Sequence, residues 1–149
     1  MRLYLDASAL VKNYLIEAGS SDVVAATAAA LSVGTSIIGY AEVRAAFARA
    51  LREARLDAAS HSACVSLLDA HWPRYAVVES DGPCVRDAAR LVDQYSRHAL
   101  RAFDAVHLAS AVVIAAGLPA RITFGCWDQR LWRAARDEGF IMLPPTEPA

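Results

Sequence analysis

The segment "RAFDAVHLASAVVIAAG", residues 101–117, is the most informative stretch of the chain. From Ala102 to Ala116 nearly every side chain is apolar, and neither Gly nor Pro interrupts it, so it predicts a buried helix. Asp104 nevertheless lies in the first turn of that helix. A carboxylate among so many apolar side chains is costly unless its charge is compensated. The segment therefore predicts a compensating positive charge near Asp104.

Short apolar strands alternate with helical segments along the rest of the chain. We expect strands at residues 2–5, 34–39, 75–80, 120–124 and 140–144. We expect helices at residues 8–19, 21–31, 40–56, 57–68, 83–98, 102–116 and 128–139, with Ser20, Asp57 and Asp81 as N-caps and Gly19 as a C-terminal stop. This alternation predicts one α/β domain over residues 1–143, with a mainly parallel central sheet flanked by helices. Residues 144–149 are predicted to be a frayed tail.

The composition excludes several classes of protein. Hydrophobic residues make up 56% of the 149, which argues against disorder, and no apolar run approaches the roughly 20 residues that span a bilayer. No signal peptide is evident, so we expect a cytoplasmic protein. The three cysteines form no CxxC pair, which predicts reduced, mostly buried thiols rather than a disulfide framework or a zinc site.

Four acidic residues fall where a parallel sheet places its ligands. Asp6 follows the first strand directly, while Glu42 and Asp128 lie just beyond two other strands, and Asp104 opens the apolar helix. Ligands bind beyond the carboxyl ends of the strands in such sheets. Four carboxylates at one edge would repel one another without a cation, and hard oxygen ligands suit Mg²⁺ or Mn²⁺. The sequence therefore predicts a divalent-metal site made by these acids.

Three of these acids also have a purely structural explanation, whereas Asp104 is harder to explain as a cap because Ala102 and Phe103 precede it. Asp128 could cap a helix. Glu42 could be an acid that the helix dipole favours in a first turn, and Asp6 could end its strand in an Asx turn. One shared cation explains all of them together. Such a site can activate water and stabilise a phosphodiester during displacement. Arginines on two helical segments could contact the phosphates of a polyanion, or could simply form solvated faces: Arg44, Arg49, Arg52, Arg55, Arg86, Arg90, Arg97 and Arg101.

The order of these motifs resembles the PIN-domain family, and within it the VapC-type toxins of bacterial toxin–antitoxin pairs. "LYLDASALVKNYLIEAGS" resembles the family's opening, with Asp6 as the first acid and Ser8 as its hydroxyl companion. "GTSIIGYAEVRAAFARA" resembles the second motif and places Glu42, while "RAFDAVHLASAVVIAAG" resembles the third and places Asp104. "ITFGCWDQRLWRAARDEGF" resembles the last motif and places Asp128. The resemblance covers nearly the whole chain.

The resemblance implies a Mg²⁺- or Mn²⁺-dependent endoribonuclease that leaves 5′-phosphates, with these four acids as metal ligands and catalytic residues. It also implies a homodimer and a cognate antitoxin that covers the groove of the active site. An apolar surface of Val11, Tyr14, Leu15 and Ile16 could face either partner, although core packing explains the same residues. Ser8 would orient Asp6 or a bound water.

The sequence departs from the family pattern before its last acid. In "TFGCWD" the expected hydroxyl is either replaced by Cys126 or displaced to Thr123. His107 follows Asp104 by one turn, and we expect it to pack or hydrogen-bond locally rather than to bind metal.

Two other functions are compatible with parts of the pattern. A phosphatase of the haloacid-dehalogenase type would need a second Asp two residues after Asp6, where this chain has Ser8. A non-catalytic PIN-like module that binds RNA or protein would not need all four acids.

Overall fold

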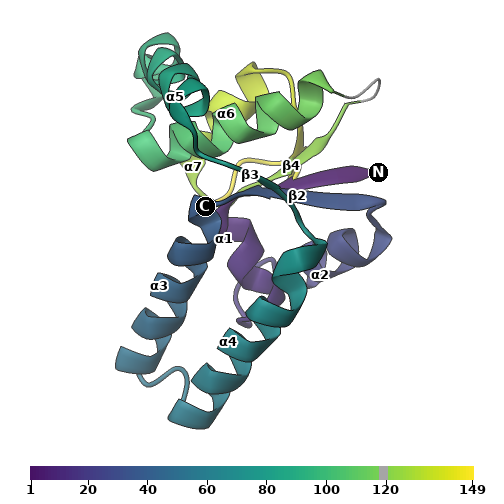
Figure 1. Cartoon of the computed structure of the whole chain (residues 1–149), viewed down its shortest axis with the longest axis vertical. Coiled ribbons are helices and arrows are strands. Elements are labelled where there is room, and N and C mark those ends of the chain that lie inside the picture. Colours follow the sequence, from purple (N-terminus) through teal and green to yellow (C-terminus); the bar gives the residue numbers. More distant parts are fainter. Residues whose placement is uncertain (118–120) are drawn as a thin grey trace.

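A computed structural model describes residues 1–117 and 121–149 (Figure 1). Five strands form one sheet in the order β3-β2-β1-β4-β5, with every neighbouring pair parallel. The strands are β1 (Arg2–Leu5), β2 (Ser32–Ser36), β3 (Ala76–Val78), β4 (Thr123–Gly125) and β5 (Ile141–Leu143). The α-helices are α1 (Ala7–Leu10), α2 (Ser20–Ala29), α3 (Ile38–Arg52), α4 (Ala58–His71), α5 (Gly82–Gln94), α6 (Ala102–Ala116) and α7 (Gln129–Asp137). The predicted α/β fold with a parallel central sheet is therefore confirmed.

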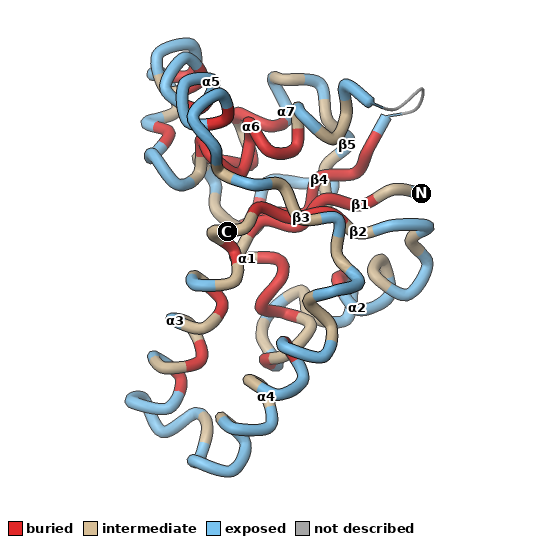
Figure 2. Tube along the Cα trace, in the orientation of Figure 1, coloured by how far each residue is buried: buried red, intermediate tan, exposed pale blue. Residues whose placement is uncertain are grey.

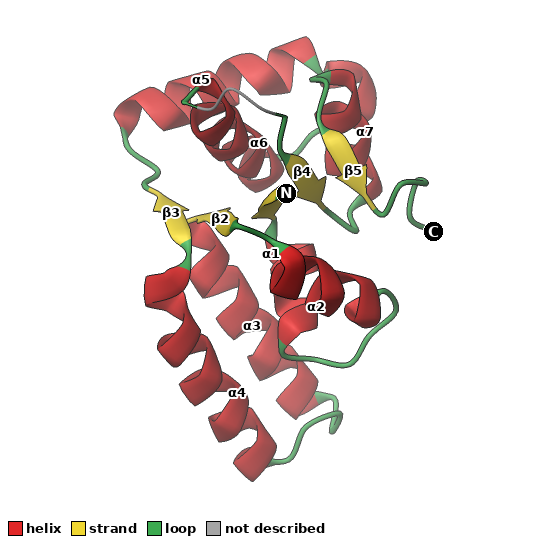
Figure 3. Cartoon of the chain, turned by 90° about the vertical axis from the view of Figure 1, so that its right-hand side faces the viewer, coloured by secondary structure: helices red, strands yellow, loops and turns green. Residues whose placement is uncertain are grey.

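Helices cover both faces of the sheet. Helices α5, α6 and α7 lie on one face, and α1 to α4 lie on the other, where α3 and α4 project away as a long pair (Figures 1 and 3). The central strand β1 contributes to both cores because its side chains alternate: Tyr4 packs with the α5–α7 layer, while Leu3 and Leu5 pack with the α1–α4 layer. Burial is concentrated along β1, β4, α1 and α6 (Figure 2). Among the described residues, no helix is both long and apolar enough to span a lipid bilayer.

The register of β1, β2 and β4 places the segments after these strands side by side. Leu5 pairs with Gly125, and Tyr4 pairs with Gly34. Two hydrogen bonds extend this alignment at the ends of the strands: the Asp6 amide donates to the Gly125 carbonyl at 3.1 Å, and Thr35 Oγ1 donates to the Leu5 carbonyl at 2.8 Å. Residues that follow these strands, Asp6 among them, therefore share one edge of the sheet.

Several segments differ in their bounds from the sequence prediction, among them α3, which ends at Arg52, and α5, which ends at Gln94. The helix expected over 8–19 ends early, since α1 is followed only by a 3₁₀ turn at Val11–Asn13, and the N-cap of α2 is Gly19 rather than Ser20. The strand expected over 34–39 lies at Ser32–Ser36, because Ile37 already has helical dihedral angles and precedes α3. The N-caps Asp57 and Asp81 are confirmed. Ala120, the first residue of the strand expected at 120–124, lies outside the described residues.

The C-terminal tail packs against α7, which differs from the frayed tail that the sequence predicts. Trp132 Nε1 donates to the Pro144 carbonyl at 3.0 Å, and Gln129 Nε2 donates to the Pro148 carbonyl at 3.0 Å. Arg133 forms an ion pair with Glu147. These contacts hold the tail against α7. Composition alone cannot predict them, because it does not show which polar groups of the tail find partners on the helix.

Asp137, at the end of α7, joins that helix to the segment after α5. Its carboxylate accepts hydrogen bonds from Arg97 at 2.7 Å and from His98 at 2.8 Å, and Arg136 contacts it at 3.2 Å. These donors, Arg97 foremost, lower the pKa of Asp137. The ionised carboxylate therefore contributes stability above its ordinary pKa of about 4, and this contribution is lost as the pH falls below that value.

We expect Asp137→Asn to lower the free energy of unfolding by about 1 kcal/mol at pH 7, a value kept small because the side chains are partly exposed. The difference should shrink as the pH is lowered to 3, and chemical denaturation at both pH values measures it. Asp87→Asn, which affects only a 3.9 Å surface pair with Arg90, is the matched control and should change stability little. An equal loss at pH 3 and pH 7 would contradict the electrostatic cause.

Candidate functional site

Asp6 lies at the carboxyl end of β1 and caps α1. The Ala9 amide donates to Asp6 Oδ1 at 2.8 Å, which is the bond an N-cap carboxylate makes. The residue is only 4% exposed. Burial raises the pKa of Asp6 above its ordinary value, although His107 and the hydrogen bonds from Ser8 and Ala9 act in the opposite direction. Asp6 is therefore both a structural helix cap and a buried carboxylate whose negative charge is energetically costly.

The Ser8 hydroxyl connects Asp6 to the loop between β4 and α7. Ser8 Oγ lies 2.8 and 2.9 Å from the two carboxylate oxygens of Asp6, and it accepts a 2.7 Å hydrogen bond from the Trp127 amide. The Trp127 indole lies between Gly19, where an added Cβ would come within 2.4 Å of the ring, and Lys12, whose Nζ is 5.1 Å from the ring centroid. Sequence reasoning did not identify Trp127.

Asp104 is partly buried at the start of α6. Its Oδ2 accepts a 3.2 Å hydrogen bond from the Arg101 amide, as expected of an acid in a first helical turn. Burial, and then the Asp128 carboxylate, raise the pKa of Asp104 to about 6, with a smaller contribution from Asp6. Within residues 1–117 and 121–149, no Lys, Arg or His side chain forms an ion pair with any of these three acids. Among the described residues, Arg101 lowers the pKa of Asp104 and His107 lowers that of Asp6, but both effects are smaller than the effect of burial, so the charge of these acids is only partly compensated.

Asp128 caps α7, so its structural explanation also holds. Its Oδ1 accepts hydrogen bonds from the amides of Arg130 at 2.9 Å and Leu131 at 3.1 Å. Cys126 is buried close by, and its Sγ donates to the Asp128 carbonyl at 3.3 Å. Burial, together with the Asp6 carboxylate, raises the pKa of the Cys126 thiol well above its usual value, so it is neutral at pH 7.

Glu42 is directed toward His107 rather than toward the other acids. Glu42 Oε2 lies 2.8 Å from His107 Nε2, and His107 Nδ1 lies 2.9 Å from the Tyr4 hydroxyl. His107 is 2% exposed and Tyr4 is fully buried. Sequence reasoning expected only local bonding for His107, whereas its partners come from β1 and α3. A periodicity signal cannot reveal such contacts, because the three residues are far apart in the chain.

Asp128 and Asp6 both raise the pKa of Asp104, and His107, which contacts Glu42, lowers the pKa of Asp6. In the described part of the chain, no three His, Cys, Asp or Glu side chains are grouped closely enough to hold a metal ion. The donor chemistry nevertheless fits a cation. Asp104 Oδ1 and Asp128 Oδ2 accept no hydrogen bond from described residues. Mg²⁺ retains several waters and needs only one or two direct carboxylates.

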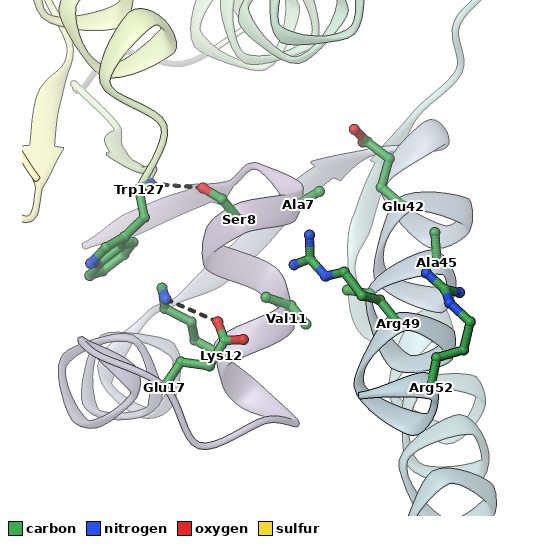
Figure 4. A pocket seen from close by; sticks show the side chains of 11 residues that line it. Ala7, Ser8, Val11, Lys12, Glu17, Glu42, Ala45, Arg49, Arg52 and Trp127 are labelled. Carbon is green, nitrogen blue, oxygen red and sulfur yellow. Dashed lines mark hydrogen bonds and ion pairs between the residues drawn. The ribbon is translucent and has the colours of Figure 1, made fainter. Parts of the chain in front are cut away.

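A groove of about 630 Å³ runs between α1 and α3, and Glu42 is the one of the four predicted acids among its lining residues (Figure 4). Ser8 and Glu42 line it on opposite walls, Arg49 extends from α3 toward its interior, and Arg52 lines it along α3. Lys12 contributes less free charge because it lies 3.3 Å from Glu17. Val11 lines the groove but is 6% exposed, and Leu15 is 5% exposed, so core packing accounts for both; Ile16, in contrast, is 99% exposed.

The sequence is similar to two curated ribonucleases. Ribonuclease VapC45 of Mycobacterium tuberculosis (strain CDC 1551 / Oshkosh) and Ribonuclease VapC49 of M. tuberculosis (strain ATCC 25618 / H37Rv) are each 35% identical to this chain over 142 residues. Each alignment covers 95% of this chain and 94% of the relative.

Solved structures share the fold at lower identity. The crystal structure of FitAcB from Neisseria gonorrhoeae has a TM-score of 0.68 at 20% identity and covers 90% of this chain and 93% of that one. VapBC2 from Rickettsia felis, bound to a DNA fragment from their promoter, has a TM-score of 0.63 at 13% identity, covering 95% and 97%. The family model for the PIN domain matches residues 3–125, most of the chain. This protein therefore belongs to the PIN-domain family.

Proposed function

We propose that this protein is an endoribonuclease and the toxin of a toxin–antitoxin pair. The PIN-domain match and the full-length similarity to two VapC ribonucleases support this assignment. The observation that carries it is the environment of Asp104, a carboxylate whose pKa is raised by burial and by two neighbouring carboxylates, with a smaller opposing effect of Arg101 and no ion pair to a described side chain. Such a cluster is suited to a divalent cation and, through it, to phosphodiester hydrolysis.

Asp6, Asp104 and Asp128 would hold Mg²⁺ or Mn²⁺, with Glu42 as the fourth acid. The ion, when bound, supplies an activated water and offsets charge on the phosphate. The chain's own contribution is positioning. Ser8 fixes both oxygens of Asp6 and ties them to the segment that carries Asp128, so two of the acids are held in a fixed relation. Acids that are held in fixed positions lower the entropic cost of reaching the reactive arrangement.

The RNA backbone would follow the groove between α1 and α3. The four arginines predicted on this helical face differ in their contacts. Arg55 is paired with Glu17 and Glu53, and Arg44 lies on the Tyr40 ring. Arg49 and Arg52 line the groove, and neither has an ion-pair partner among the described residues. These two guanidinium groups are therefore the ones available to phosphates.

We expect Arg49→Gln and Arg52→Gln each to weaken RNA binding, and each to reduce the slope of log K against log salt concentration by about 0.7, the value for one lost contact to single-stranded phosphate. Fluorescence anisotropy of labelled single-stranded RNA, titrated in chelator at several KCl concentrations, measures both quantities. Arg55→Gln is the matched control and should leave the slope unchanged. If all three variants shift the slope equally, the groove does not direct the RNA.

A cognate antitoxin and a second copy of the chain are the proposed protein partners. The likeness to VapBC2, which is bound to promoter DNA, supports an antitoxin partner. Expression of this chain alone should arrest growth, and co-expression of an adjacent small reading frame should relieve the arrest.

For the activity itself, purified protein should cleave mixed RNA with Mg²⁺ or Mn²⁺, and cleavage should stop when chelator is added. Cleavage that persists in chelator would contradict the metal-dependent mechanism.

A further inference from the structure

We infer that His107 is a positioning residue that, together with Tyr4, fixes the Glu42 carboxylate at the edge of the candidate site. The inference rests on the proposed function, because it gives Glu42 its place in an ion-binding set. Its basis is a continuous chain of contacts through the core: Tyr4 Oη to His107 Nδ1 at 2.9 Å, and His107 Nε2 to Glu42 Oε2 at 2.8 Å. The chain joins β1, α6 and α3.

The chemistry of the groups fixes the direction of the bond between His107 and Glu42. An ionised carboxylate can only accept hydrogen bonds, so His107 Nε2 must carry the proton that it donates to Glu42. A ring protonated at Nε2 alone accepts from the Tyr4 hydroxyl at Nδ1, and an imidazolium donates to that hydroxyl, so the contact with Tyr4 is made in both states. Each group thus sets the orientation of the next. This is the arrangement by which an outer partner orients the ligand that it touches.

Packing alone does not explain a histidine at this position. Residues 105–111 of α6 are all buried, and an imidazole in such a place costs solvation energy that an aliphatic side chain does not. The backbone also makes room for the ring, since a Cβ on Gly39 would lie 3.4 Å from His107 Cε1 and 3.1 Å from Thr35 Oγ1. Glu42, with its side chain 29% exposed, is where this buried chain reaches solvent.

Without this chain, Glu42 would be a flexible glutamate on the first turns of α3, and ordering it on the ion would cost rotamer entropy. We therefore expect His107→Leu to weaken Mn²⁺ binding about tenfold, the lower end of the effect of losing an outer partner. Tyr4→Phe, which keeps the ring and removes the hydroxyl, should give a smaller loss. His107→Gln should restore much of the affinity, because its amide N–H can still donate to Glu42.

The primary measurement is Mn²⁺ affinity without RNA, from the electron paramagnetic resonance signal of free Mn²⁺, with thermal melts of every variant. Leu108→Val, a fully buried neighbour in α6, controls for lost core packing, and His61→Gln controls for the substitution itself. Equal Mn²⁺ affinity of wild type and His107→Leu would overturn the inference. So would a loss that His107→Gln does not restore, or a wild type that binds no Mn²⁺. Mn²⁺ binding without RNA cleavage would instead contradict only the proposed function.

A second measurement needs no metal. Long-range ¹H–¹⁵N correlation spectra of the metal-free protein should show His107 protonated at Nε2, and Tyr4→Phe should alter the Nδ1 resonance. A ring protonated at Nδ1 alone would mean that it does not donate to Glu42, and this result would overturn the inference even if Mn²⁺ affinity fell.

Discussion

Asp6→Asn is expected to reduce metal-dependent RNA cleavage at least about a hundredfold, because even the loss of an outer partner of a metal ligand costs ten- to a hundredfold. The fold should survive the change. Asn is as good an N-cap as Asp, so the 2.8 Å bond from the Ala9 amide can be kept. What the substitution removes is the negative charge at the end of β1. Steady-state cleavage of a labelled RNA in excess Mn²⁺, with a circular dichroism melt of each protein, measures the two effects separately.

Asp57→Asn is the matched control for this experiment. Asp57 caps α4 with a 2.7 Å bond from the Ser60 amide, which is the same structural role at an exposed position away from the acids. Its substitution should leave RNA cleavage unchanged. Comparable losses from Asp6→Asn and Asp57→Asn would show that capping, not charge, explains the effect, and would remove Asp6 from the catalytic set.

Asp104→Asn is expected to make the metal-free protein more stable, by about 1 kcal/mol or about 3 °C in Tm at pH 7 to 8. The pKa of Asp104 rises from 3.8 to about 6 on folding, so ionising this group opposes folding. The penalty is absent below pH 4, grows between pH 4 and 6, and is complete above pH 6. Partial exposure and the retained bond from the Arg101 amide keep the expected gain modest.

Differential scanning calorimetry in chelator, at pH 4 and pH 7.5, tests this expectation. The two proteins should melt together at pH 4 and apart at pH 7.5. The order should reverse in excess Mg²⁺, because the ion stabilises the wild type that binds it more tightly. Asp104→Asn and Asp128→Asn should be less than additive in chelator, since each removes the same repulsion. A clear loss of stability at pH 7.5 would mean that Asp104 is structurally required in its ionised form.

The fold could be predicted from sequence where apolar patterning and capping agree. The helix over 102–116 was predicted to the residue, because an uninterrupted apolar run leaves little choice. Ile37 and Ile38 misled the strand prediction, since β-branched residues favour strands while their position after β2 requires a turn into α3. Residues 14–19 did not continue α1, and the Ser20 hydroxyl instead donates to the Leu15 carbonyl. Such side-chain contacts with the backbone override helix propensity.

The candidate site could be predicted in outline only. The rule that ligands bind at the carboxyl ends of parallel strands was enough to select Asp6, Glu42 and Asp128, the buried helix that starts near Asp104 added the fourth acid, and the resemblance gave the same set. The contacts that organise them could not be predicted, because they join residues from separate elements: Ser8 with Trp127, and Glu42 with His107. The structural and functional explanations also proved compatible, since Asp6 and Asp128 are helix caps as well as candidate ligands.

Gly19 has a consequence for how this chain tolerates sequence change. Its φ of +84° and the Trp127 ring against it leave no space for a side chain, so the loop before α2 is packed against the residue preceding Asp128. Substitution of Gly19 is therefore constrained by the packing beside the acids, although glycine has no side chain that could take part in the site. A change that looks like a neutral loop variation would be transmitted through the indole to the loop that presents the last carboxylate.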